Sequence, residues 1–363
     1  MLLAREGDYE AALMELERGG ISQDNCARAV TGPDPEAILV KGRVLDRLGR
    51  YDEAFSCFAR AKQLARESGK KGYRELEAKE MADRLRQFFV DDRLHLMPRA
   101  TVRNDSSQPI FILGFPRSGT TLVEQSLSFH PRIAAGDELP FIGELSQSLP
   151  RLFDSRLSYP EAIAELWMGD NRRGLDMLRD VYLQKVEMCK VLKPNCTWFT
   201  DKMPLNEMHL GLIALMFPHS PLIHILRHPL DVVLSVFSYQ LTHGYFCAYG
   251  LASIAHHYAL VFDLVQHYRA QMALKYLPLR YEDMVDNMAT SMRRTLEFIN
   301  EPFDERCLNF QDNPRLPQTP SYCQVSEKIY DRSHFRYRHY LKHLEPVIPI
   351  LQPAMDRLGY SVE

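Results

Sequence analysis

The 363-residue sequence contains no long apolar run, no paired cysteines and almost no excess of one charge. No window approaches 18 continuous apolar residues, and the segment Met1–Glu6 turns charged at once, so we expect neither a membrane span nor a signal anchor. A formal net charge of −3 gives no global field that would attract nucleic acid or an anionic membrane. Any anion-binding site must therefore be built locally.

The cysteines and histidines exclude further classes of site. None of the seven cysteines forms a CxxC pair, so neither a zinc knuckle nor a disulfide framework is expected, and reduced thiols in the cytoplasm are the default. The histidines form no HExxH pattern, and no third side chain is evident that would complete a metal site with a pair of them, so we predict no metal site. The cysteines are Cys26, Cys57, Cys189, Cys196, Cys247, Cys307 and Cys323.

The first hundred residues are typical of successive amphipathic helices. Gly49, Tyr51 and Ala54 lie between two apolar-periodic runs, and the same residue types recur with the same offsets 42 residues earlier, from Gly7. This pattern resembles tetratricopeptide repeats, whose stacked helices offer a groove to a protein partner. A generic helical hairpin is the alternative, because two imperfect copies are few. We predict an all-α, tetratricopeptide-like region over residues 1–97.

After a polar linker at residues 98–109, short β-rich runs alternate with longer helical patterns. Such alternation, with nearly continuous apolar strands, predicts an α/β domain over residues 110–363: a P-loop-type three-layer sandwich around a central parallel sheet. Sites in such sheets gather at the carboxyl ends of the strands. The expected strands are 110–113, 133–135, 198–200, 222–226 and 276–279. The expected helices include 73–89, 119–129, 205–217, 231–241 and 284–299.

The segment from Gly114 to Thr121 has the spacing of a phosphate-binding loop between a strand and a helix. Where a nucleotide triphosphatase carries Lys, this chain has Thr120. No apolar strand ends in a convincing metal-binding Asp, because Lys202 stands beside the nearest candidate, Asp201. A donor with less charge than a triphosphate, held without a metal, fits these residues better.

The loop resembles the 5′-phosphosulfate loop of the sulfotransferases, and its surroundings most resemble the tyrosylprotein sulfotransferases and bacterial proteins that fuse tetratricopeptide repeats to such a domain. The resemblance covers roughly residues 109–340 and implies a donor, 3′-phosphoadenosine 5′-phosphosulfate (PAPS), with adenosine 3′,5′-bisphosphate as product and no metal. The loop residues that it assigns to the donor are Pro116, Arg117, Ser118, Gly119, Thr120 and Thr121.

A second segment supports the resemblance. Arg227 follows the strand expected at 222–226, and Ser235 lies eight residues further along. In sulfotransferases this arrangement binds the 3′-phosphate of the donor. On its own, the segment could equally hold a buried pair between Arg227 and Asp231. Tyr281, after the last expected strand, resembles the family tyrosine that packs near the adenosine; a plain core tyrosine is the alternative.

Sulfuryl transfer needs a base for the acceptor hydroxyl and positive charge on the donor oxygens. The run Gly136-Asp137-Glu138 resembles the Gly-Glu-Glu of tyrosylprotein sulfotransferases, which implies Glu138 as base, with Asp137 a departure from that pattern. The resemblance assigns Lys202 to the leaving phosphate and Arg117 to the sulfuryl oxygens. For Glu138, the alternative is a carboxylate that only stabilises the start of a helix. For Lys202, the alternative is an ion pair with Asp201.

The acceptor hydroxyl is the open question. The resemblance favours a peptidyl tyrosine, but saccharides, lipids and small phenols also suit a Glu base. A basic segment, residues 328–342, could close over the nucleotide with Arg332 or Ser333, or form an exposed basic helix. Two other functions compete: an ATP-dependent phosphotransferase, and a repeat-based adaptor with an inactive transferase domain.

Overall fold

A computed structural model describes residues 8–18, 34–68, 72–103, 105–168, 173–241, 246–310 and 334–362 of the chain. Gly7, Cys26, Cys323 and the segment 328–333 lie outside these residues. The chain divides into two compact units. The helical unit comprises Met1–Glu77, His228–Ala259 and Arg332–Glu363, and the sheet unit comprises Ala78–Arg227 and Leu260–Asp331.

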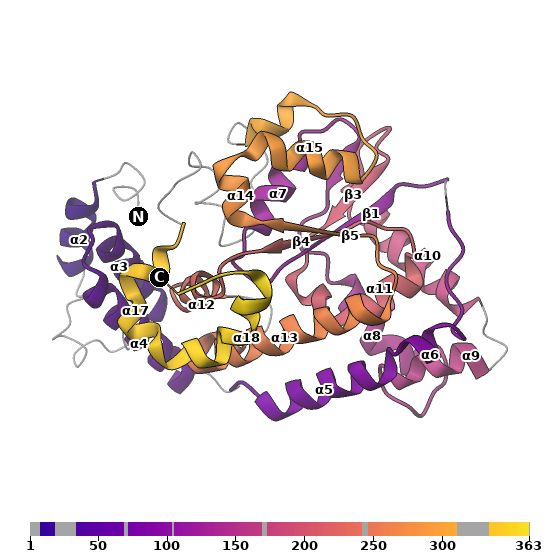
Figure 1. The fold of residues 1–363 in the computed structure, drawn as a ribbon, viewed down its shortest axis with the longest axis horizontal. Coiled ribbons are helices and arrows are strands. Elements are labelled where there is room, and N and C mark those ends of the chain that lie inside the picture. The colour runs from indigo at the N-terminus through magenta and orange to yellow at the C-terminus, as the bar shows by residue number, and fades with distance from the viewer. Residues whose placement is uncertain are drawn as a thin grey trace. The chain divides into compact units, whose positions relative to one another are not determined.

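The sheet unit is built on five strands that all run parallel, in the order β2-β3-β1-β4-β5. The parallel sheet of the predicted α/β domain is therefore confirmed, and the predicted strand limits agree with the observed ones to within two residues. Figure 1 shows the strands fanning across the middle of this unit. The strands are β1 (Gln108–Leu113), β2 (Ile133–Ala135), β3 (Trp198–Asp201), β4 (Leu222–Leu226) and β5 (Tyr276–Arg280).

Helices cover both faces of the sheet, which gives the expected three layers (Figure 1). Alternate residues of β1 define the faces: Ile110 and Ile112 belong to one apolar core, and Phe111 and Leu113 to the other. The first core also takes residues of α7 (Thr120–Leu127), α14 (Tyr281–Asp286) and α15 (Met288–Phe298). The second takes residues of α8 (Phe141–Leu152), α10 (Gly174–Met188) and α11 (Leu210–Met216).

The helix predicted at 73–89 is confirmed as α5 (Glu75–Phe88), and its buried residues all belong to the second core. Ala82, Leu85 and Phe88 lie in that core, although the sequence placed this helix in the N-terminal helical region. Phe89 packs so closely on α11 that a Cβ at Gly211 would lie 2.5 Å from its ring. The predicted boundary at residue 97 stays a prediction.

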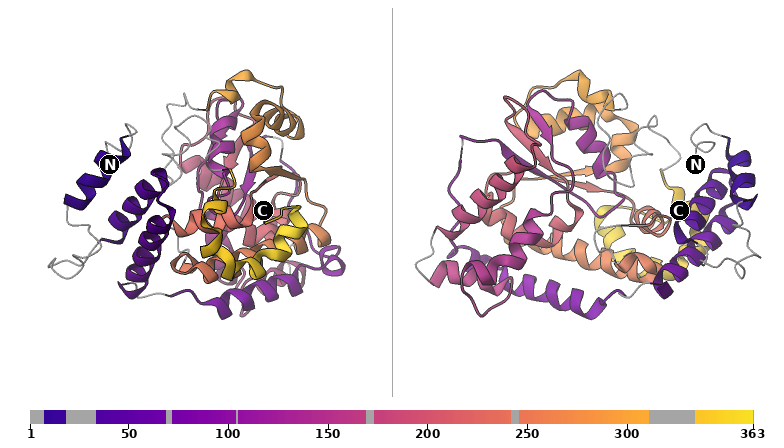
Figure 2. Two further views of the ribbon diagram at one scale, coloured as in Figure 1. Left: turned by 60° about the vertical axis from the view of Figure 1, so that its left-hand side comes forward. Right: turned by 180° about the vertical axis from the view of Figure 1, so that it is seen from behind.

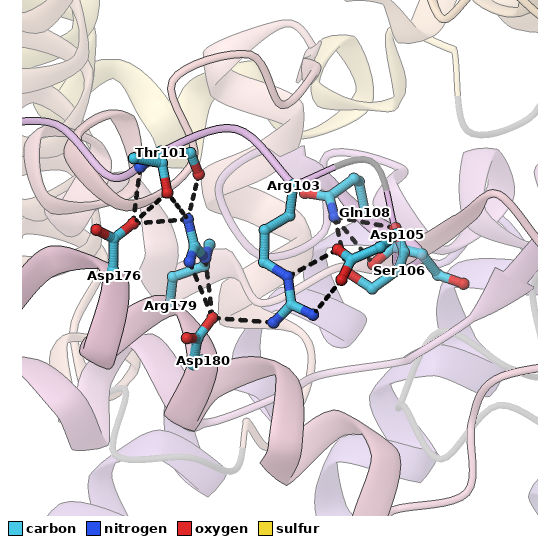
Figure 3. A network of polar contacts seen from close by, with 9 residues as sticks. Thr101, Arg103, Asp105, Ser106, Gln108, Asp176, Arg179 and Asp180 are labelled. Carbon is cyan, nitrogen blue, oxygen red and sulfur yellow. Dashed lines mark hydrogen bonds and ion pairs between the residues drawn. The ribbon is translucent and has the colours of Figure 1, made fainter.

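The segment predicted as a linker lies against α10 through a polar network (Figure 3). Asp176 accepts hydrogen bonds from the backbone N–H of Thr101 at 2.7 Å and from its hydroxyl at 2.8 Å. Arg103 forms an ion pair with Asp180 at 3.1 Å, and the buried Arg179 donates to the Thr101 carbonyl. These bonds fix the approach of the chain to β1.

In the helical unit, α3 (Pro35–Arg47) and α4 (Tyr51–Ser68) are joined by a tight turn (Figure 2). Gly49 makes the turn with φ +76°, a conformation that favours glycine. At Gly42 the two helices touch: a Cβ there would lie 2.5 Å from the ring of the fully buried Phe58. A close helical hairpin is thus present. Its assignment as a tetratricopeptide repeat stays a prediction.

The same unit holds α12 (Pro229–Phe237), the helix that carries Ser235. Two cations bind carbonyls just beyond its carboxyl end: Arg43 donates to Ser238 at 3.2 Å and Lys62 donates to Tyr239 at 2.5 Å. At its other end Asp231 accepts from the backbone N–H of Tyr337 at 2.8 Å. The N-terminal hairpin and the C-terminal segment therefore both hold α12.

The remaining elements are short, apart from one long helix. Among the described residues, no helix combines the length and the apolar composition that crossing a membrane requires. These elements are α2 (Tyr9–Arg18), α6 (Asp91–Leu94), α9 (Glu165–Met168), α13 (Leu251–Gln271), α17 (Leu341–Leu344) and α18 (Ile348–Leu358), with 3-10 turns at Glu161–Ala164, Pro204–His209, Phe246–Tyr249, Glu305–Leu308, Arg336–Tyr340 and Glu345–Val347.

The close approach at Gly42 predicts that Gly42→Ala destabilises the protein, by about 1–3 kcal/mol, because the added methyl meets a fully buried ring. Urea unfolding measures the effect. The control is Gly143→Ala on α8, where an added Cβ meets no atom within 4 Å and the substitution should stabilise by up to about 1 kcal/mol. Equal stabilisation by both changes would contradict the tight packing of α3 on α4.

Candidate active site

The candidate residues of the sheet unit lie where its strands end. Because all five strands are parallel, their carboxyl ends meet at one edge of the sheet. Gly114 follows β1, Lys202 follows β3, Arg227 follows β4, and Tyr281 follows β5. Three residues after β2 comes Glu138. The topology therefore gathers these residues at the edge where ligands of parallel sheets bind.

The loop between β1 and α7 depends on glycine at two points. Gly114 has φ +145°, and a Cβ there would lie 2.4 Å from the Ser118 hydroxyl. Gly119 has φ +107° and ends the loop. Between them Arg117 also adopts a left-handed conformation, with φ 75°, and its side chain is buried. A non-glycine residue in this region is a strained feature of the kind that gathers at binding sites.

This loop suits an anionic group. Helix α7 begins at Thr120 with no side-chain cap, so the positive end of its dipole faces the loop. The Ser118 hydroxyl is buried, and it makes no hydrogen bond within the part of the chain that the structure describes. Thr120 and Thr121 follow closely in the chain, and their side chains are also buried. An oxyanion at the loop would satisfy the Ser118 hydroxyl.

Arg227 lies against the loop. Its Nη1 donates to the Arg117 carbonyl at 3.1 Å, and its guanidinium lies over the ring of Tyr281, 4.5 Å from the ring centre. The same ring packs on the loop, because a Cβ at Gly119 would lie 2.4 Å from it. The structure thus brings together the loop, Arg227 and Tyr281, three features predicted from separate parts of the sequence.

Glu138 and Lys202 form an ion pair, with 3.0 Å between Oε1 and Nζ. Lys202 is fully buried and Glu138 only partly so, with a side chain 19% exposed. The alternative ion pair of Lys202 with Asp201 is absent: Asp201 instead accepts from Tyr182 at 2.6 Å and from Asn206 at 3.1 Å. The physical reason is that adjacent residues of an extended chain point to opposite sides.

The structure also shows polar residues that the sequence reasoning missed. Glu124 on α7 accepts from the Thr200 hydroxyl at 2.7 Å and from the backbone N–H of Asp137 at 3.0 Å. It is fully buried, and no Lys, Arg or Asp occurs on its helix. The sequence did contain one signal for Glu124, namely a single carboxylate in a helix of otherwise uncharged residues. Tyr182 and Asn206 carried no comparable signal.

Burial raises the pKa of Asp201 to about 7, and repulsion by Glu124 acts in the same direction, against the hydrogen bonds from Tyr182 and Asn206. Asp201 therefore holds a proton more tightly in the folded protein than in the unfolded chain, where the pKa is about 3.9.

Two other predicted features belong to the helical unit. Ser235 is buried on α12. Of the basic segment 328–342, Arg332 and Ser333 lie outside the described residues. In its described part Arg336 pairs with Asp46 at 2.9 Å and Tyr340 is fully buried, whereas the Lys342 side chain is 62% exposed.

The matching family model decides the identity of the chain. It is described as the sulfotransferase family, and it matches residues 109–305, which include all but the first residue of the five-stranded sheet. The chain belongs to the sulfotransferase family. The family indicated by the loop is therefore confirmed.

The chain is also similar to curated proteins. An uncharacterized protein of Aquifex aeolicus is 32% identical over 330 residues, which cover 89% of this chain and 42% of that protein. Protein-tyrosine sulfotransferase 1 of Danio rerio is 25% identical over 213 residues, 58% of each chain. This sulfotransferase-family chain thus spans about half the length of the curated relatives it matches.

Solved structures of sulfotransferase domains are more distant. The domain of the Synechococcus PCC 7002 olefin synthase has a TM-score of 0.47 at 22% identity, covering 67% of this chain and 90% of that domain. The domain of the curacin biosynthetic pathway has a TM-score of 0.48 at 20% identity, covering 71% of this chain and 100% of that domain.

The raised pKa of Asp201 predicts how stability depends on pH. Because the folded-state pKa lies above the unfolded value, the free energy of unfolding should fall as pH rises from about 4 to about 7, by up to about 1.4 kcal/mol per pH unit from this group. Asp201→Asn removes that contribution and should make the slope less negative. Denaturant unfolding at several pH values measures it.

The control for this prediction is Asp92→Asn, at an exposed position on α6. The control should keep the wild-type slope between pH 4 and 7. If Asp201→Asn has the same slope as the control, the buried carboxyl does not bind its proton more tightly in the folded state.

Proposed function

We propose that this sulfotransferase-family chain moves a sulfuryl group from PAPS to an acceptor hydroxyl. Glu138 takes the hydroxyl proton, the acceptor oxygen forms a bond to sulfur, and the bond from sulfur to the bridging phosphate oxygen breaks. The products are a sulfate ester, adenosine 3′,5′-bisphosphate and protonated Glu138. No metal takes part in this scheme, in which Lys202 and Arg117 supply the positive charge.

The observation that carries the proposal is the ion pair of Glu138 with the buried Lys202 at 3.0 Å. Each charge neutralises the other in a site where an isolated charge would be costly. A donor whose leaving oxygen takes the place of the carboxylate at Lys202 would free Glu138 for the acceptor hydroxyl. The pair would then supply both a base and a cation to the proposed reaction.

The loop and Arg227 would hold the donor at its two anionic ends. We assign the 5′-phosphosulfate to Arg117 and to the loop from Pro116 to Thr121, because its N–H groups and hydroxyls suit an oxyanion. We assign the 3′-phosphate to Arg227, whose guanidinium lies beside the loop. The further assignments of Ser235 to that phosphate and of Tyr281 to the adenosine rest on sequence resemblance.

We propose a peptidyl tyrosine as the acceptor class to test first. The support is similarity to protein-tyrosine sulfotransferase 1 of Danio rerio, at 25% identity over 213 residues. The close hairpin of α3 and α4 supports a further proposal, that the N-terminal helices belong to a tetratricopeptide-like region that binds a protein partner.

The proposal predicts that wild-type protein transfers labelled sulfate from PAPS to at least one acceptor in a panel of tyrosine peptides, glycans and phenols. Glu138→Gln should lower kcat by about 100-fold or more, since it removes the base, and should weaken the affinity for adenosine 3′,5′-bisphosphate by no more than about threefold. Product identification and calorimetry measure the two effects.

A matched control is Glu144→Gln. Glu144 on α8 forms an ion pair with Lys185 at 2.7 Å, but both side chains are exposed. Its loss should leave kcat unchanged. Full activity of Glu138→Gln, or an equal loss in both variants, would overturn the assignment of Glu138 as base.

A further inference from the structure

Glu124 joins the donor loop to the segment that carries the proposed base. It lies on α7, one turn after Thr120, where the helix leaves the loop. One oxygen of its carboxylate, Oε1, accepts both from the Thr200 hydroxyl at 2.7 Å and from the backbone N–H of Asp137 at 3.0 Å. A fully buried carboxylate thus binds the residue directly before Glu138.

The segment from Gly136 to Glu138 has a conformation that needs such support. Asp137 has φ 61°, in the left-handed region that non-glycine residues seldom adopt. A Cβ at Gly136 would lie 2.1 Å from the Thr200 carbonyl oxygen, so the segment packs directly on the end of β3. This geometry persists only where the surroundings over-determine it.

Further bonds attach the same segment to β3 and to the residue after it. The backbone N–H of Gly136 donates to the Thr200 hydroxyl at 3.2 Å, and the N–H of Lys202 donates to the Asp137 carbonyl at 2.9 Å. Thr200 therefore stands between Gly136 and Glu124 and contacts both. With these bonds in place, the Glu138 carboxylate reaches Lys202.

We propose that Glu124 is a positioning residue for Glu138: its carboxylate holds the backbone of Asp137 and, through Thr200, that of Gly136, so that the base faces Lys202. The inference rests on the proposed role of Glu138. It adds a physical link between the proposed donor loop and the proposed base, because the helix that begins at the donor loop also fixes the segment that carries Glu138.

Glu124→Leu tests the proposal by removing the acceptor oxygen at similar size. It should lower kcat by about 10- to 100-fold and leave the affinity for adenosine 3′,5′-bisphosphate within about threefold, because the loop itself is unchanged. Glu124→Gln keeps an oxygen that can accept both bonds and should retain at least about a third of kcat. Equal losses of kcat in the two variants would contradict the proposal.

The decisive comparison is made in the Glu138→Gln background. If Glu124 acts through Glu138, Glu124→Leu should have almost no further effect there; if it lowers the residual rate by its full factor, the positioning role is wrong. Should Glu124→Leu fail to fold, Thr200→Val removes one of the two donors and carries the same comparison. High activity of Glu138→Gln alone would instead refute the proposed base, a distinct outcome.

Discussion

The parallel alignment of the five strands is the constraint on which the candidate site depends. It brings Gly114, Lys202 and Arg227 to one edge, although long crossovers separate them in sequence. Polar groups can gather there because the strands behind them are buried on both faces. Close packing then sets the detail: Gly136 meets the end of β3 with no room for a Cβ, and the Glu138–Lys202 pair lies just beyond.

Much of this arrangement could be predicted from the sequence. The strands at 133–135 and 222–226 agree at both ends, because short apolar runs bounded by polar residues leave little choice of limits. The loop from Gly114 was found from its glycine spacing, which reflects the close approaches that the structure shows. The family could also be predicted from that loop, because the residues expected to bind the donor are neighbours in the chain and their spacing is visible in the sequence.

Contacts that depend on packing could not be predicted. The apolar stripe of α5 indicates that a face is buried, but not that its partner is the core beneath the sheet. Lys202 pairs with Glu138, 64 residues away, rather than with its neighbour Asp201. Arg336 and Asp46 pair across 290 residues. Glu124 gave a signal, a lone carboxylate in an uncharged helix, but no pattern named its partners.

The most direct test of the central claim is calorimetric titration with adenosine 3′,5′-bisphosphate and with adenosine 5′-monophosphate, both in the presence of a chelator. If Arg227 makes the proposed charge-assisted bonds to the 3′-phosphate, the bisphosphate should bind at least about tenfold more tightly, and Arg227→Gln should lose this preference. Equal affinities for the two nucleotides, or no binding of the bisphosphate while the chelator is present, would contradict the account.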